Sequence, residues 1–82
     1  IKKKIKFDII FIVGTIEHLI DPKKTIKNFH KILKLNGKLV IEIAHDQKKM
    51  VKYILRQNGF FINKVVKDLG RNDRCIISTK IN

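Results

Sequence analysis

Apolar residues along the chain follow two patterns, whose order predicts alternating strands and helices. Continuous β-branched and aromatic runs at residues 6–14 and 38–44 are typical of strands buried on both faces, as in a parallel sheet. In residues 20–37 and 45–59, apolar positions recur at helical spacing, with lysines on the other side. Two further strand-like runs occupy residues 60–69 and 74–81.

Both predicted helices carry residues that favour helix ends. Asp21 is a good N-cap, and Pro22 suits the first helical position. The dipeptides Asn36-Gly37 and Asn58-Gly59 follow the last periodic positions, and glycine favours the left-handed conformation of a C-terminal cap. We therefore expect the two helices to end at these dipeptides.

The resulting order is strand, helix, strand, helix, strand, strand. Strands that alternate with helices predict an α/β fold with right-handed crossovers and a parallel sheet. The short linker at residues 70–73 predicts that the last two strands form an antiparallel hairpin, which makes the sheet mixed. The chain shows no repeat, low-complexity linker or domain boundary, so we expect a single domain over residues 1–82.

The formal net charge of +12 allows two interpretations. It fits a nucleic-acid or anionic-membrane partner, or it reflects a lysine-rich composition whose charges are solvated. The lysines are scattered over every segment, and arginine, the better phosphate ligand, occurs only at Arg56, Arg71 and Arg74. The second interpretation is favoured, and a nucleic-acid partner is not expected.

The N-terminal run resembles a signal peptide, but Asp8 interrupts it and no small-residue cleavage site follows. The run is also too short to span a bilayer, so no membrane partner is expected. The single cysteine, Cys75, excludes an internal disulfide and fits a buried strand position. These features together favour a cytoplasmic protein.

Candidate chemistry lies in the two segments that follow the predicted parallel strands, because ligands of open α/β sheets bind beyond the carboxyl ends of the strands. The first segment, residues 13–21, contains Glu17, His18 and Asp21, and the second, residues 44–47, contains His45 and Asp46. The spacing matches no metal-ligand pattern, so we expect no metal. For His18, a structural role and a functional role are both open.

Other candidates have simpler explanations. Thr15 and Ser78 lack the strained, glycine-flanked turn that exposes a nucleophile. His30 lies on the apolar side of a predicted helix and fits a half-buried core position. The chain contains no glycine-rich phosphate loop.

The segment "FDIIFIVGTIEHLIDPKKTIKNFHKILKLNGKLVIEI" (residues 7–43) resembles the second half of class I S-adenosylmethionine-dependent methyltransferases. The shared pattern is Phe-Asp before an apolar strand, Glu-His-Leu after it, and then Asp-Pro. The resemblance implies a seven-stranded mixed sheet that ends in an antiparallel hairpin. The six elements predicted above would be its fourth to seventh strands with two helices, so residues 1–82 would form the C-terminal part of such a domain.

The tail is similar to the C-terminus of bacterial release-factor glutamine methyltransferases. The matching positions are Glu42, Ile43, Gln47, Gly59, Phe60, Lys67, Asp68, Leu69, Asp73 and Arg74. Asp68 and Arg74 would face each other across the hairpin turn, most simply as a structural ion pair. Glu42 is charged within a buried run, so we expect it to point at the pocket end or to pair with a neighbour.

One motif departs from that glutamine methyltransferase family, which carries Asn-Pro-Pro-Tyr directly after the strand. Here the aligned positions are Val13, Gly14, Thr15 and Ile16. The segment instead resembles methyltransferases of the Glu-His-Leu type, which act on small molecules. No catalytic residue is therefore assigned. The resemblance implies that Gly14, Thr15, Glu17 and His18 form the wall of the cofactor and acceptor pocket.

The resemblance implies an enzyme that uses S-adenosylmethionine, whose main binding loop would lie upstream of this chain. The acceptor would be a glutamine of a peptide chain release factor or, alternatively, a small molecule. A basic nucleic-acid-binding module without catalysis is the alternative from another class. The isolated chain is expected to be inactive.

Overall fold

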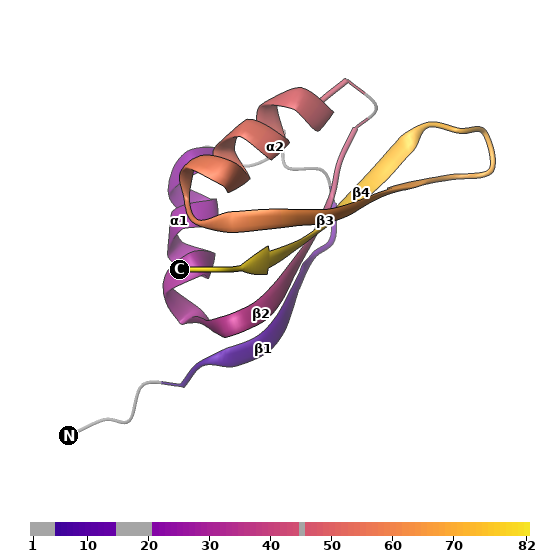
Figure 1. The fold of residues 1–82 in the computed structure, drawn as a ribbon. Coiled ribbons are helices and arrows are strands. Elements are labelled where there is room, and N and C mark those ends of the chain that lie inside the picture. Colours follow the sequence, from indigo (N-terminus) through magenta and orange to yellow (C-terminus); the bar gives the residue numbers. More distant parts are fainter. Residues whose placement is uncertain (1–4, 15–20, 45) are drawn as a thin grey trace.

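The computed structural model describes residues 5–14, 21–44 and 46–82. Its elements are β1 (Phe7–Ile12), α1 (Pro22–Ile32), β2 (Leu33–Glu42), α2 (Lys48–Gln57), β3 (Phe60–Lys67) and β4 (Asp73–Lys80). This order confirms the predicted α/β class, and Figure 1 shows the helices and the strands as separate layers.

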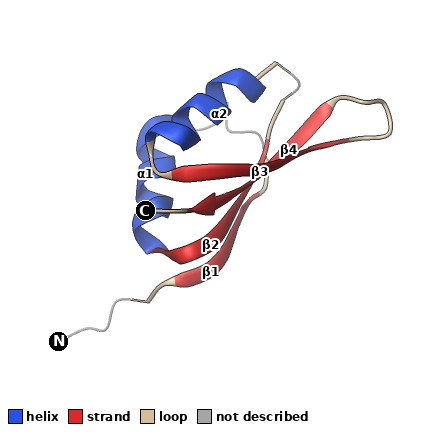
Figure 2. Cartoon of the chain, viewed as in Figure 1, coloured by secondary structure: helices blue, strands red, loops and turns tan. Residues whose placement is uncertain are grey.

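The four strands form one mixed sheet in the order β1-β2-β4-β3. β1 pairs with β2 in parallel, whereas β4 pairs antiparallel with both β2 and β3. The predicted closing hairpin is thus confirmed, and its last strand inserts between β2 and β3. Right-handed crossovers that advance in one direction along a sheet place their helices on the same face. In Figure 2, α1 and α2 accordingly lie on one side of the strands.

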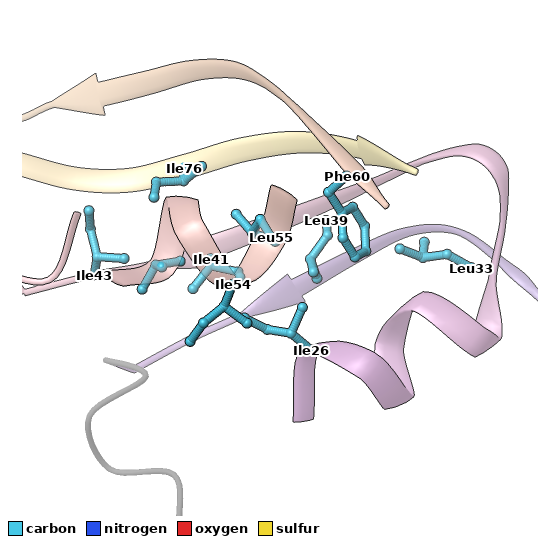
Figure 3. Packing of buried hydrophobic residues seen from close by; sticks show 10 residues of the cluster. Ile26, Leu33, Leu39, Ile41, Ile43, Ile54, Leu55, Phe60 and Ile76 are labelled. Atoms are coloured by element: carbon cyan, nitrogen blue, oxygen red, sulfur yellow. The ribbon is translucent and has the colours of Figure 1, made fainter. Parts of the chain in front are cut away.

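A single apolar cluster joins that helical layer to the sheet. α1 contributes Ile26, and α2 contributes Val51, Ile54 and Leu55. Figure 3 shows the side chains of Ile26, Ile54 and Leu55 beside the sheet residues of the same cluster, which are Leu33, Leu39, Ile41, Ile43, Phe60 and Ile76. Each such side chain contributes about 1.5–3 kcal/mol when it is fully buried. This cluster holds the two helices against the sheet.

The start of α1 agrees with the prediction, but its end does not. The Asp21 carboxylate accepts a hydrogen bond from the Lys24 N–H at 3.0 Å, and Pro22 is the first helical residue. The helix then ends at Ile32, not at Asn36-Gly37. The side chain of Lys80 donates hydrogen bonds to the carbonyl oxygens of His30 and Leu33, at 2.7 and 3.0 Å, and so caps the helix from the far end of the chain.

Residues 33–37 therefore belong to an irregular start of β2, so the strand is longer than the predicted 38–44. Leu33 is buried and pairs with Phe7, whereas the next regular pair is Ile9 with Lys38. Asn36 adopts a left-handed φ of 69° in the interruption. A Cβ on Gly37 would lie 2.7 Å from the Lys34 carbonyl oxygen, so the dipeptide forms a tight bend where only glycine fits.

The prediction that β1 is buried on both faces is wrong for the described chain. β1 is an edge strand, and Phe7, Ile9 and Phe11 are 47%, 47% and 64% exposed. Ile10 and Ile12 alternate with them and pack partly against the core. The strand therefore has one packed face and one open apolar face.

Candidate functional site

The carboxyl ends of β1 and β2 meet at one edge of the sheet. The two strands are parallel and in register, with Ile12 opposite Ile41. The described residues that follow them, Val13 and Gly14 after β1 and Ala44 after β2, therefore lie at the same edge, where the sequence predicts the candidate segments. In open α/β sheets this edge is the place where ligands bind.

Gly14 begins the first of these segments. It is exposed and has a φ of +87°, a conformation that other L-residues rarely adopt. A Cβ built on it would meet no atom of the described residues within 4 Å, so on their side a ligand can approach this stretch of backbone closely. The other predicted wall residues, Thr15, Glu17 and His18, lie outside the described residues.

The second segment is a short turn held by its own hydrogen bonds. The Gln47 N–H donates to the Ala44 carbonyl oxygen at 3.0 Å, and the Ala44 N–H donates to Gln47 Oε1 at 3.0 Å. Gln47 is buried, and its carbonyl oxygen accepts a helical bond from Val51. These bonds fix the start of α2 at the edge of the sheet where β1 and β2 end. His45 lies outside the described residues, and Asp46 is exposed.

Glu42 differs from expectation. It is the last residue of β2 and is exposed, because it lies on the face of the sheet opposite the helices. Its neighbours Ile41 and Ile43 are fully buried on the helical face. The premise that Glu42 belongs to a run buried on both faces is therefore wrong. An exposed carboxylate is solvated by water, so it does not need the partner that a buried carboxylate requires.

The tail residues that resemble the glutamine methyltransferases support the hairpin. Asp68 Oδ2 accepts a hydrogen bond from Arg74 Nε at 2.9 Å, which confirms the predicted ion pair. Asp68 Oδ1 accepts from the Asn72 N–H at 2.9 Å. The Asn72 N–H, followed by the Arg74 side chain, holds the pKa of Asp68 below its usual value. These matched positions thus explain the fold more directly than the chemistry.

Two further contacts connect the C-terminal strand β4 and the residues after it to α2 and its C-terminal end. Sequence reasoning missed both. Lys48 Nζ lies 3.3 Å from Asp73 Oδ2 and joins the start of α2 to β4. Gly59 has a φ of +82° after α2, as predicted for a C-terminal cap, and its carbonyl oxygen accepts a hydrogen bond from the Ile81 N–H at 3.0 Å. Their partners are distant in sequence, so local pattern carries no signal for them.

The remaining candidates fit structural roles. His30 is half-buried on α1, and its ring meets Phe60 edge-on with centroids 5.3 Å apart. Cys75 is a half-buried free thiol in β4. In residues 5–14, 21–44 and 46–82, no three His, Cys, Asp or Glu side chains gather into a group suited to a metal ion. Nor does any described helix have the length and apolar character needed to cross a membrane.

Comparison with known proteins shows a similarity to methyltransferases. Residues 3–41 match the family model described as "Methyltransferase domain". A "Bifunctional methyltransferase" of Rickettsia felis is 43% identical over 56 residues, which are 68% of this chain and 11% of that protein. The "Release factor glutamine methyltransferase" of Fusobacterium nucleatum is 50% identical over 48 residues, which are 58% of this chain and 14% of that protein.

The chain resembles the class I methyltransferases. Within that family it resembles the release factor glutamine methyltransferases, as a second relative from Aquifex aeolicus also indicates, with 42% identity over 50 residues. The chain spans little more than a tenth of the length of the curated relatives it matches.

Solved structures support the fold of this chain. A "Methyltransferase from Pyrococcus furiosus" superposes with a TM-score of 0.67 at 17% identity, covering 98% of this chain and 44% of that one. The protein-(glutamine-N5) methyltransferase (release factor-specific) of Alicyclobacillus acidocaldarius gives a TM-score of 0.59 at 21% identity, covering 94% and 50%. At these identities the likeness concerns the fold alone.

Proposed function

We propose that residues 1–82 form the C-terminal part of a methyltransferase domain that transfers a methyl group from S-adenosylmethionine to a glutamine side chain of a peptide chain release factor. One observation carries the proposal. The parallel pair β1/β2 brings its two carboxyl ends to one edge, where Gly14 is left-handed and open to close approach. The names of the Fusobacterium nucleatum and Aquifex aeolicus relatives favour the glutamine acceptor.

S-adenosylmethionine supplies a methyl group on a sulfonium that is already a good leaving group, so the protein mainly has to align the acceptor. In the proposed pocket, Gly14 lets a ligand lie against the backbone, and Thr15 continues the same wall. The Glu17 carboxylate or the His18 imidazole orients the acceptor and takes its proton. The bonded turn at Ala44 and Gln47 fixes the opposite side of the edge.

The proposal is tested on the protein that carries this chain, with isotope-labelled S-adenosylmethionine and a bacterial release factor. We expect label on a glutamine side chain, located by mass spectrometry of tryptic peptides. Glu17→Gln and His18→Asn are expected to lower the rate about a hundredfold or more, the lower end of what a positioned acid or base contributes. Asp8→Asn, at the opposite end of β1, is the matched control and should leave the rate unchanged. Absence of labelled glutamine under conditions in which the protein binds the cofactor would refute the assignment.

A small-molecule acceptor is the second candidate. It is favoured by residues 13–16, where the Asn-Pro-Pro-Tyr motif of the glutamine methyltransferases does not occur. In the same assay this candidate predicts label in the low-molecular-mass fraction of a cell extract and none on the release factor.

A further inference from the structure

The helical layer carries positive charge only. Every side chain of α1 and α2 that is charged at neutral pH is a lysine or an arginine: Lys23, Lys24, Lys27 and Lys31 on α1, and Lys48, Lys49, Lys52 and Arg56 on α2. The acidic residues of the described chain lie in strands and loops instead. Seven of the sixteen lysines, together with Arg56, therefore lie in the helical layer, on the side of the sheet where Figure 1 shows both helices.

This cationic layer faces solvent because the apolar sides of both helices are already used. Ile26 of α1 and Val51, Ile54 and Leu55 of α2 are buried against the sheet. A basic amphipathic helix binds a membrane by inserting its apolar side, which is not available here. The layer is thus suited to a partner that is itself strongly and repetitively anionic.

An exposed aromatic side chain lies within the charges of α2. Tyr53 is 60% exposed, and helical spacing puts Lys49 and Arg56 on its side of the helix. These side chains border one shallow hollow on the surface. It is lined by Lys48, Lys49, Lys52, Tyr53, Arg56 and Gln57. Cations around an accessible aromatic ring form the combination that holds a phosphate backbone while a base stacks on the ring.

We propose that the outer face of α2, extended by the lysines of α1, binds single-stranded nucleic acid. Lys49, Lys52 and Arg56 contact phosphates, and the Tyr53 ring stacks on a base. The sequence alone favours solvated charges, because it does not show that the basic residues of the two helices lie close together in space. The inference is independent of the proposed methyl transfer, because the hollow is lined by α2 residues only.

The test is fluorescence anisotropy of a labelled oligouridylate of about 12 nucleotides, within the range of common single-strand site sizes. Lys49→Gln/Arg56→Gln should weaken binding and lower the slope of log affinity against log salt by about 1.4, that is about 0.7 for each lost phosphate contact. The matched control Lys64→Gln/Arg71→Gln removes one lysine and one arginine from exposed positions of β3 and the hairpin turn, and should change binding much less.

Tyr53 separates a specific site from general attraction. Tyr53→Ala should weaken binding about tenfold, as for the loss of one stacked base, whereas Tyr53→Phe should bind like the unaltered chain. Circular dichroism confirms that each variant is folded. The proposal is overturned if the control pair weakens binding as much as the α2 pair, or if Tyr53→Ala has no effect. Equal affinity for polyglutamate or for anionic vesicles would overturn it too.

Discussion

Arg74 Nε lies 2.9 Å from Asp68 Oδ2, across the turn that joins β3 to β4. The same carboxylate accepts the Asn72 N–H, and the Asp68 backbone exchanges hydrogen bonds with Asn72 and Arg71. One half-buried side chain thus closes the turn that brings the last strand back into the sheet. Because β4 lies between β2 and β3, the turn determines whether the sheet is continuous.

We expect Asp68→Ala to lower the melting temperature at pH 7. The carboxylate has a lowered pKa in the folded chain, so its ionised form stabilises the fold above its ordinary pKa of 3.8, and this contribution is lost as the pH falls through the folded value. The difference in melting temperature between the two chains should therefore shrink on acidification, as followed by circular dichroism. Asp8→Asn is the control, because the Asp8–Lys34 pair is highly exposed and should contribute little. A difference that stays constant down to pH 2 would contradict the assignment.

The two left-handed glycines allow a matched comparison. Gly14→Ala forces alanine into a φ of +87° with free space around it, which costs about 1–2 kcal/mol. Gly59→Ala imposes a similar φ of +82° and also presses the new methyl group against Asn82 and His30. We expect Gly59→Ala to lose about 1–3 kcal/mol more than Gly14→Ala in urea unfolding, as for overpacking of a filled space. Equal losses of unfolding free energy in the two variants would mean that Asn82 and His30 move away from the new methyl group without strain.

Sequence patterns predicted the elements well where a local contact decides the outcome. Asp21 caps a helix because its carboxylate reaches an N–H three residues ahead, and Asp68 meets Arg74 because a short turn leaves them little alternative. The end of α1 was not predictable in this way. Asn36-Gly37 suits a helix cap and an extended bend equally well, and Lys80, from the far end of the chain, decides between them.

The sequence indicates where a candidate site would lie, but not the environment of its individual residues. An alternation of strands and helices brings the ends of β1 and β2 together whatever the loop residues are, so residues 13–21 and 44–47 could be named as candidates. The burial of individual strand residues could not be predicted. An apolar run shows that a strand can be buried, but not which strands and helices pack against it. Glu42 and Phe11 are exposed for this reason.

Substitution by serine should change the stability little at Phe11 and lower it strongly at Ile10. Phe11 is 64% exposed on the open face of β1, whereas Ile10 packs against the core. Phe11→Ser should change the free energy of unfolding by no more than about 0.5 kcal/mol, as for a surface position. Ile10→Ser should cost about 2–4 kcal/mol, since it removes packed apolar atoms and brings a hydroxyl group towards the core. Urea unfolding of both variants checks the alternation, and a larger loss for Phe11→Ser would show that the open face is covered in solution.

His30 makes the fold sensitive to mild acid. Its Nε2 atom is buried and makes no well-formed hydrogen bond with the described residues, and the ring lies edge-on to Phe60. Burial lowers the pKa of His30 below 6.5; the Asn82 backbone opposes this shift in part, and Lys80 and Lys6 add to it. A lowered folded pKa means that the neutral ring stabilises the fold above pH 6.5, and that this contribution is lost as the pH falls below that value.

The free energy of unfolding should therefore decline between pH 6.5 and pH 5, where most carboxylates are still ionised. Urea titrations at several pH values measure it. His30→Leu has a similar volume and no titrating group, so its stability should be nearly constant over the same interval. His18→Asn and His45→Asn are the control variants for the other two histidines. Both should retain the decline in the free energy of unfolding. If His30→Leu also retains it, the proton that destabilises the fold binds elsewhere.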